Sequence, residues 1–483
     1  MLILGAEVEG VAGVDVRIEG ALITEVSADL ARRPGEPAVE AHGGALLPGL
    51  HDHHVHLRAW AAARESVSLA AAHSPDDVDR RISGAAAAAP EGAWLRGVGW
   101  HESTGGDLDR HRLDALAGRR PVRIQHRTGA LWVLNSAALE LTGAAGSAVA
   151  GIERGADGEP TGRLWRADEW LRERTAPARD PFPGALAALA AEAASYGVTR
   201  WTDATPGRTQ SETDTLAALW SGDGADVADA GTGSAAARRL PGLVLMSPPG
   251  LAPRNGVTLG PQKLVLDDAT LPSVDDLAAT IRDSHAAGSP VAVHCVTAEQ
   301  LVTLVAALDA AGAVDGDRVE HAGVVPPGYA ARLAALGLTV VTNPGFLTDR
   351  GDSFRRDVPE PERDWLYPVR SLLDAGVTVA AATDAPFGPA DPWVAIAAAT
   401  HRRTPDGHVL GPDERVPAAT ALDLFHTDPD HTAGPPAPGS PAPGRPAPRR
   451  RVAVGQPSDL VLLHTPLATA LADPSSAHVR TVL

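Results

Sequence analysis

The sequence predicts an α/β protein with a parallel β-sheet and crossover helices, joined to a small β module formed by both ends of the chain. From residue 48 onward, short apolar segments ending in polar residues alternate with Ala- and Leu-rich helical segments, as in parallel sheets. Residues 1–47 and 458–467 instead alternate apolar with polar positions, which is typical of strands with one buried face. The 483 residues, 44% of them hydrophobic, suffice for one large and one smaller domain.

The predicted elements follow in order along the chain. The N-terminal module contains three predicted strands, at residues 3–10, 14–20 and 21–28. The central region contains six clear strands, at 197–204, 263–268, 290–295, 317–323, 338–344 and 377–386. Among the intervening helices, Ser273 followed by Asp276 predicts a helix start, with Gly288 near its end. Gly337 and Gly376 predict the ends of two further helices.

Two segments have compositions that do not build a core. Residues 221–239 are rich in Gly, Ala and Asp, and residues 427–451 form a Pro/Gly-rich linker. We expect the chain to leave the N-terminal module, form the parallel sheet, and return to the module after the linker.

Charge and composition exclude several functions. The net charge of −18 argues against nucleic acid or an anionic membrane as partner. The single cysteine, Cys295, excludes an intrachain disulfide, and the N-terminus lacks the basic region of a signal peptide. No uncharged apolar run reaches about 18 residues. We therefore expect a cytoplasmic protein.

Four histidines lie together in the segment LPGLHDHHVHL, residues 47–57. Because residues two apart on a strand share a face, His54 and His56 can bind one metal ion together, whereas His53 points elsewhere. A His-X-His pair alone is weak evidence for a metal.

Polar residues at other strand ends strengthen the metal hypothesis. His294, His321 and Asp384 end predicted strands, and buried polar groups there are costly unless they are paired or ligate metal. In a closed parallel barrel the carboxyl ends of all strands meet at one rim, which is where such barrels place their active sites. Imidazole and oxygen ligands favour zinc. Taken singly, each histidine could be a hydrogen-bonded core residue, and Asp384 could cap a helix.

Lys263 is the only lysine among 42 basic residues. A lysine amine, unlike the arginine guanidinium, can lose its proton and can then capture CO2 as a carbamate that bridges two metal ions. The alternative is a surface charge without a function.

Several motifs together resemble the amidohydrolase superfamily. The segment PGLHDHHVHL resembles the superfamily's signature on its first barrel strand. The chain is most similar to amidohydrolase family 3, which includes N-substituted formamide deformylases and exoenzyme-regulator-like proteins. The other matching segments are residues 119–143, 157–162, 197–204, 260–268, 318–323, 383–386 and 455–463.

This resemblance implies a distorted (β/α)8 TIM-like barrel at residues 48–426, with an insertion at about 65–175 after the first strand. It also implies a composite β-sandwich from residues 1–47 and 452–483. The implied metal is Zn2+, one or two ions, with other divalent metals as alternatives. By resemblance, His54 and His56 bind the more buried ion with Asp384, carboxylated Lys263 bridges, and His294 and His321 bind the second ion.

The implied reaction is hydrolysis of a C–N bond in a small amide, formamide or cyclic amide by a metal-bound hydroxide. Asp384 would act as general base and then as general acid. If only one ion is present, His294 or His321 would instead orient the substrate. The alternatives are hydrolysis of a lactone or ester, a deamination, or a non-catalytic binder on the same fold. The expected partner is a small-molecule substrate, and a homodimer is compatible with the sequence.

The insertion departs from the family pattern at one place. Family members often carry a histidine after the glycine that precedes the Asn-Ser motif, but here Ala130 follows Gly129, and His126 is nearby but out of register. Other residues could face the substrate or simply pack, namely Trp100, His101, Trp132, Asn135, Asn343, Pro344, Phe346, Phe387 and Trp393.

Overall fold

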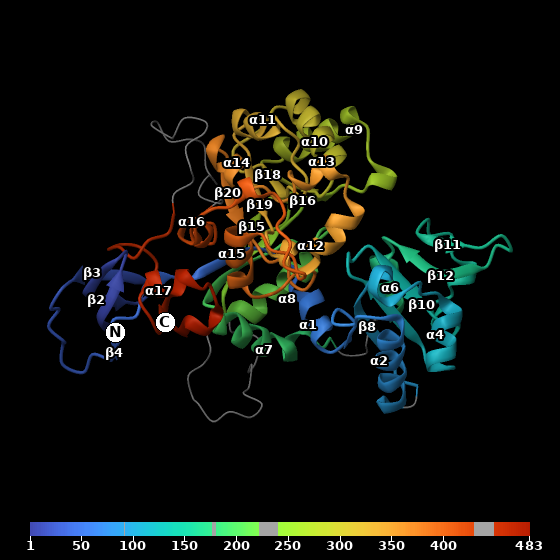
Figure 1. Ribbon diagram of the computed structural model, residues 1–483, viewed down its shortest axis with the longest axis horizontal. Coiled ribbons are helices and arrows are strands. Elements are labelled where there is room, and N and C mark those ends of the chain that lie inside the picture. The colour runs from blue at the N-terminus through green and yellow to red at the C-terminus, as the bar shows by residue number, and fades with distance from the viewer. Residues whose placement is uncertain (91, 176–179, 222–239, 429–448) are drawn as a thin grey trace. The chain divides into compact units, whose positions relative to one another are not determined.

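The computed structural model describes residues 1–90, 92–175, 180–221, 240–428 and 449–483 (Figure 1). The chain forms two compact units. The first comprises Met1–His56 and Ala187–Leu483, and the second comprises Leu57–Leu186.

Parallel strands form the centre of the first unit, in two sheets ordered β15-β14-β13-β6 and β16-β17-β18-β19-β20. Their bounds are Leu50–Val55 (β6), Val198–Asp203 (β13), Gly242–Met246 (β14), Val257–Gly260 (β15), Gln262–Val265 (β16), Val291–Cys295 (β17), Arg318–His321 (β18), Thr339–Thr342 (β19) and Thr378–Ala381 (β20).

The two sheets follow one another in a cyclic order. Strand β15 continues into β16 through Pro261, so a single bent strand belongs to both sheets. At the other junction, Asp384 N donates to His54 O at 2.9 Å and His56 N donates to Ala385 O at 2.8 Å. The segment after β20 therefore lies along β6, which is the strand order of a (β/α)8 barrel whose hydrogen-bond ladder is interrupted at two places.

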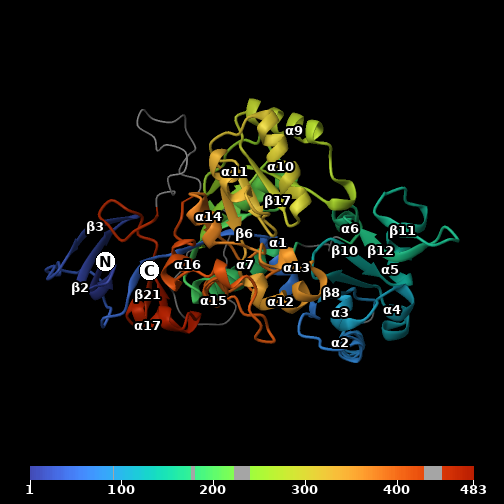
Figure 2. The same ribbon diagram turned by 45° about the horizontal axis from the view of Figure 1, so that its top comes forward.

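The helices that follow the strands lie on the outside of this arrangement (Figure 2). They include Val274–Ala286 (α9), Ala298–Ala311 (α10), Tyr329–Ala335 (α11), Arg370–Asp374 (α14), Pro392–His401 (α15) and Ala418–Asp423 (α16). The predicted start of α9 is confirmed, because Ser273 Oγ accepts a hydrogen bond from Asp276 N at 3.1 Å. The predicted helix ends are also confirmed, since Gly337 (φ +69°) and Gly376 (φ +82°) adopt left-handed conformations just after α11 and α14.

All six strands predicted in the central region are shorter in the structure, including the one that carries Lys263 and the one that precedes Asp384. The strand predicted at 263–268 ends at Val265, and a 3-10 turn follows at Asp268–Thr270. The strand predicted at 377–386 ends at Ala381, so Asp384 lies in the loop beyond it. Strands β14 and β15 were not predicted at all. Both are short and are flanked by Pro and Gly, which hides their period.

Both ends of the chain form the β-sandwich. One sheet has the order β3-β2-β1-β4 and the other β22-β21-β5. Their bounds are Leu2–Val8 (β1), Val11–Glu19 (β2), Leu22–Ser27 (β3), Ala38–Glu40 (β4), Leu46–Pro48 (β5), Leu460–Leu463 (β21) and Val479–Val482 (β22). Side chains from both ends share one apolar core, including Ile3, Val16, Leu460 and Leu462. Figure 1 shows the N-terminal strands in blue beside the red C-terminal segment.

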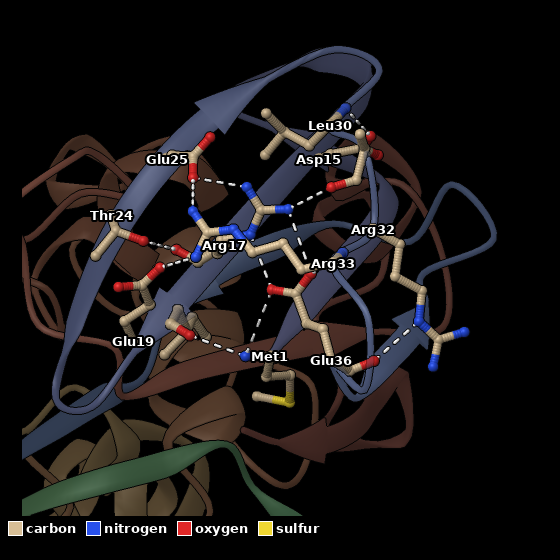
Figure 3. Close-up of polar contacts among 12 residues, drawn as sticks. Met1, Asp15, Arg17, Glu19, Thr24, Glu25, Leu30, Arg32, Arg33 and Glu36 are labelled. Carbon is tan, nitrogen blue, oxygen red and sulfur yellow. Dashed lines mark hydrogen bonds and ion pairs between the residues drawn. The ribbon is translucent and has the colours of Figure 1, made fainter.

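A buried arginine organises the outer face of this sandwich (Figure 3). Arg17, 3% exposed, donates from Nε to Glu36 Oε1 at 2.8 Å, from Nη1 to Glu25 Oε1 at 2.6 Å, and from Nη2 to Ala31 O at 2.6 Å. The charge is thus fully paired, as burial requires. These bonds fix the loop between β3 and β4.

The second unit contains one mixed sheet, ordered β11-β12-β10-β9-β8-β7. Its bounds are Val67–Ser68 (β7), Leu95–Trp100 (β8), Val122–His126 (β9), Leu131–Leu134 (β10), Ile152–Arg154 (β11) and Pro160–Trp165 (β12). Helices Pro75–Ala88 (α2), Arg110–Ala117 (α4) and Ser136–Thr142 (α5) pack with it.

Two sequence predictions concern other parts of the chain. Most of the segments 221–239 and 427–451, which were predicted to be loop and linker, lies outside the described residues. Among the helices of the described part, none is long and apolar enough to span a membrane.

We predict that His426 contributes to acid sensitivity. His426 Nε2 donates to Pro48 O at 3.1 Å, and burial lowers the pKa of His426 to about 4. The unfolded chain then binds the extra proton first, so this stabilisation is complete above pH ~6.5 and is lost as the pH falls through about 4. In urea titrations, lowering the pH from 7 to 4 should reduce the free energy of unfolding by about 3 kcal/mol less for His426→Gln than for the wild type. Parallel curves for the two proteins would contradict this.

Candidate metal centre

His54 and His56 meet Asp384 at one end of the parallel strands. His54 is on β6 and His56 follows it directly. The distance from Asp384 Oδ1 is 3.3 Å to His56 Nε2 and 3.8 Å to His54 Nε2. One ligand atom from each residue lies within 4.8 Å of the others. Three ligands of one tetrahedral ion lie about 3.3 Å apart, so this group is close to a ligand set for a single cation.

Asp384 is held in an uncommon conformation. Its φ is +58°, in the left-handed region that costs a non-Gly residue about 1–3 kcal/mol and that is concentrated at functional sites. Within the described residues, its buried Oδ1 makes no hydrogen bond of normal geometry. Burial alone would raise the pKa of Asp384, but the nearby imidazoles of His56, His54 and His321 hold it well below its usual range.

Lys263 points toward the same group from β16. Its Nζ lies 3.5 Å from His54 Nε2, and the residue is 7% exposed, so it is not a surface charge. Burial lowers the pKa of Lys263 to about 8, against the opposing charges of Glu320 and Asp384. A substantial fraction of the amine is therefore neutral near pH 8.

His321 and His294 complete the set of predicted ligands. The ring centroid of His321 lies 4.7 Å from that of His54 and 4.6 Å from that of His294, and His321 Nδ1 is 3.9 Å from Asp384 Oδ2. The structure therefore brings all six predicted residues together, with His54, His56 and Asp384 as the tightest group. His51 and His53 do not belong to it. His51 Nε2 bonds Thr202 Oγ1 at 2.9 Å, and the ring centroid of His53 lies 3.9 Å from that of His51.

Glu320 is a residue beside this centre that the sequence analysis missed. His54 Nδ1 contacts Glu320 Oε2, and Glu320 Oε1 accepts from Arg318 Nε at 2.9 Å. Glu320 and Arg318 are both almost fully buried. Adjacent residues of a regular strand face opposite sides, yet Glu320 and His321 both reach this centre, because the backbone of His321 turns with φ +70°. The sequence signal that could have identified Glu320 is its opposite charge to Arg318, two residues away on a short buried strand.

Hydrogen bonds at Nδ1 leave Nε2 of two imidazoles for a ligand. His321 Nδ1 pairs with Asn343 Oδ1 at 2.8 Å, and Asn343 Nδ2 donates to Ala382 O at 3.0 Å, which fixes the amide. Glu320 does the same for His54. Outer partners of this kind set the tautomer of metal-ligating histidines.

These observations fit a divalent cation. Burial lowers the pKa values of His54 and His321, which keeps both rings neutral near pH 7, the form that ligates metal. The ionised Asp384 supplies negative charge and an unsatisfied oxygen at the same point. Imidazole and carboxylate together favour zinc.

Four of the other candidate residues make structural hydrogen bonds or lie in the core. Asn135 Oδ1 accepts from Ala138 N at 3.0 Å and so caps α5. Trp132 Nε1 donates to Asp168 Oδ1 at 2.8 Å, and Trp393 Nε1 donates to Tyr196 O at 3.1 Å. Trp100 is 1% exposed. By contrast, the ring of Phe387 lies 5.3 Å from that of His56, beside the centre.

Comparison with known proteins decides the family. A family model described as "Amidohydrolase family" matches residues 38–472. This chain belongs to amidohydrolase family 3. The match includes all six residues of the candidate centre.

The relatives of this amidohydrolase include an N-substituted formamide deformylase of Arthrobacter pascens, 29% identical over 88% of this chain and 85% of the relative. A putative amidohydrolase of Bacillus subtilis is 24% identical over 81% of this chain and 80% of the relative. Among solved structures, an uncharacterized metal-dependent hydrolase of Pyrococcus horikoshii matches with a TM-score of 0.66 and 19% identity, covering 88% of this chain and 91% of that chain. At that identity the structural likeness concerns the fold.

We predict that Glu320→Gln weakens metal binding by about 10- to 100-fold, because His54 loses the anionic partner that orients its ring. Zinc affinity can be measured by competition with a chromogenic chelator. Glu414→Gln is the matched control. Glu414 is a buried carboxylate that accepts from Val369 N and Ser371 N, so this variant should lose stability but keep metal affinity. Equal affinities for Glu320→Gln and the wild type would contradict the assigned role.

Proposed function

We propose that this amidohydrolase is a zinc-dependent hydrolase that cleaves the C–N bond of a small amide, formamide or cyclic amide. The observation that carries the proposal is the convergence of His54, His56 and Asp384 with the buried amine of Lys263. The formamide deformylase of Arthrobacter pascens, similar along most of both chains, supports formamides as the first class to test.

The metal would be held by His54, His56 and Asp384, and a second ion would be held by His294 and His321. When bound, zinc lowers the pKa of water and polarises a carbonyl group, so that attack occurs at neutral pH. Lys263 is proposed to be carboxylated. Its amine is buried, partly neutral and 3.5 Å from His54 Nε2, where a carbamate would add two oxygens that share one negative charge.

The protein's own groups would direct proton movement. Asp384 is ionised and faces the reacting centre, so one of its oxygens can accept the proton of the attacking water and pass it to the leaving amine. The left-handed backbone at Asp384, with its N–H bonded to His54 O, fixes this carboxylate. His294 and His321 would bind the second ion or, with one ion, orient the substrate carbonyl.

The proposed bond specificity can be tested with the purified, zinc-loaded protein. The panel should contain N-formyl amines, N-acyl amines, cyclic amides, lactones and phosphoesters, with metal content measured in parallel. We expect turnover of at least one C–N substrate that is lost on chelation and restored by Zn2+. Turnover of esters or lactones alone would overturn the choice of bond, and full activity after removal of all metal would overturn the mechanism.

We predict that Lys263→Arg folds but retains at most one metal equivalent and little turnover, because a guanidinium cannot form a carbamate. Metal content by mass spectrometry and steady-state kinetics check this. Arg254→Lys exchanges the same two residue types at a site 39% exposed and should match the wild type. Wild-type metal content and rate in Lys263→Arg would refute the bridge.

We predict that Asp384→Asn lowers kcat by about 10²- to 10⁴-fold, with a much smaller change in KM, because the proton acceptor is lost. Metal content must be measured in the same preparation, since this residue is also a proposed ligand. Asp391→Asn is the matched control, because Asp391 caps α15 through Trp393 N at 2.9 Å and lies outside the centre. An unchanged kcat in Asp384→Asn would refute the proton role.

A further inference from the structure

A second group of metal-binding side chains lies within the unit Leu57–Leu186. It consists of His101, Glu102 and His126, which we call the insertion cluster. One ligand atom from each residue lies within 4.8 Å of the others. The proposed reaction does not use these residues.

The sheet of this unit places the two imidazoles side by side. Strands β8 and β9 are parallel neighbours, and Trp100 at the end of β8 pairs with His126 at the end of β9. Arg127 N also donates to Trp100 O at 2.8 Å. His101 follows Trp100, so its ring centroid lies 4.8 Å from that of His126, with a 36° angle between the rings. Ligands on strand ends are held more rigidly than ligands on long loops.

Both histidines are anchored through the same ring atom by the same local motif. Each is followed two residues later by a hydroxyl side chain. His101 Nδ1 lies 2.7 Å from Ser103 Oγ, and His126 Nδ1 lies 2.8 Å from Thr128 Oγ1. Ser103 N and Thr128 N also donate to these Nδ1 atoms, at 3.1 and 3.3 Å, so the neutral rings carry their proton on Nε2. Binding of a metal at Nε2 would move that proton to Nδ1, where the adjacent hydroxyl accepts it.

Glu102 supplies the anionic ligand. Its Oε2 lies 3.1 Å from His126 Nε2, close to the separation of about 3.3 Å between two ligands of one tetrahedral ion. The Glu102 side chain is 58% exposed and that of His126 is 9% exposed, so the cluster combines a fixed imidazole with an open approach for an ion. An ion pair this exposed contributes little stability by itself.

We propose that His101, Glu102 and His126 form a second divalent-metal site that binds an imidazole-preferring ion such as Zn2+. Two imidazoles and one carboxylate leave one tetrahedral position open to water or another ligand. This site shares no residue with the barrel centre, so its failure would leave the proposed hydrolase function untouched.

The test is a Zn2+ titration of chelator-stripped full-length protein against a chromogenic competitor, with crystals of zinc-loaded protein measured at the zinc edge. We expect His101→Gln and Glu102→Gln to weaken one class of site at least tenfold while the barrel sites keep their affinity. His111→Gln changes an exposed histidine of the same unit outside the cluster and should equal the wild type.

The crystallographic result should agree with the titration. An anomalous peak between His101, Glu102 and His126 supports the site, and its loss in Glu102→Gln confirms the ligand. Identical stoichiometry and affinity in the wild type, His101→Gln and Glu102→Gln would overturn the proposal, as would zinc peaks confined to the barrel centre. Because His101 and Glu102 are not core residues, these variants test the site without relying on the buried His126.

Discussion

The pairing of β6 with the segment after β20 is the constraint on which the rest of the centre depends. Asp384 N bonds His54 O and His56 N bonds Ala385 O, while Asp52 accepts from Thr383 N across 331 positions of sequence. The same bonds complete the cyclic strand order and bring Asp384 to the two histidines. Because the same residues make these backbone bonds and the ligand contacts, the centre forms only when the parallel strands have closed into their cyclic order.

The chemistry also depends on the residues that hydrogen-bond the candidate ligands. Glu320 and Asn343 each bond Nδ1 of a histidine, and Arg318 neutralises Glu320 in a region without solvent. A buried charge without its partner is costly in free energy, so Glu320 and Arg318 must be present together. Burial also keeps the rings of His54 and His321 neutral. Burial of His54 and His321 costs free energy on folding, and the same burial keeps both rings in the neutral form that binds a cation.

Sequence reasoning succeeded where a local pattern has one physical meaning. The Ser273 cap, the glycines after α11 and α14, and the short apolar strands each follow from backbone geometry over a few residues. It was less successful where the strand is short or the backbone is irregular. Strand β14 was missed, and β20 ends before Asp384 because the chain turns there with φ +58°. No local pattern distinguishes that turn from a continued strand.

By itself, the sequence determined the α/β class, the return of the chain to its N-terminal module, and a set of metal-type residues at strand ends, because hydrophobic period and side-chain chemistry are local properties. Only the tertiary structure decided that His54, His56 and Asp384 form the tightest group. It also decided that Glu320 contacts Nδ1 of His54 and that His126 lies beside His101. Those outcomes depend on strand register and on left-handed residues, which bring together atoms far apart in the chain.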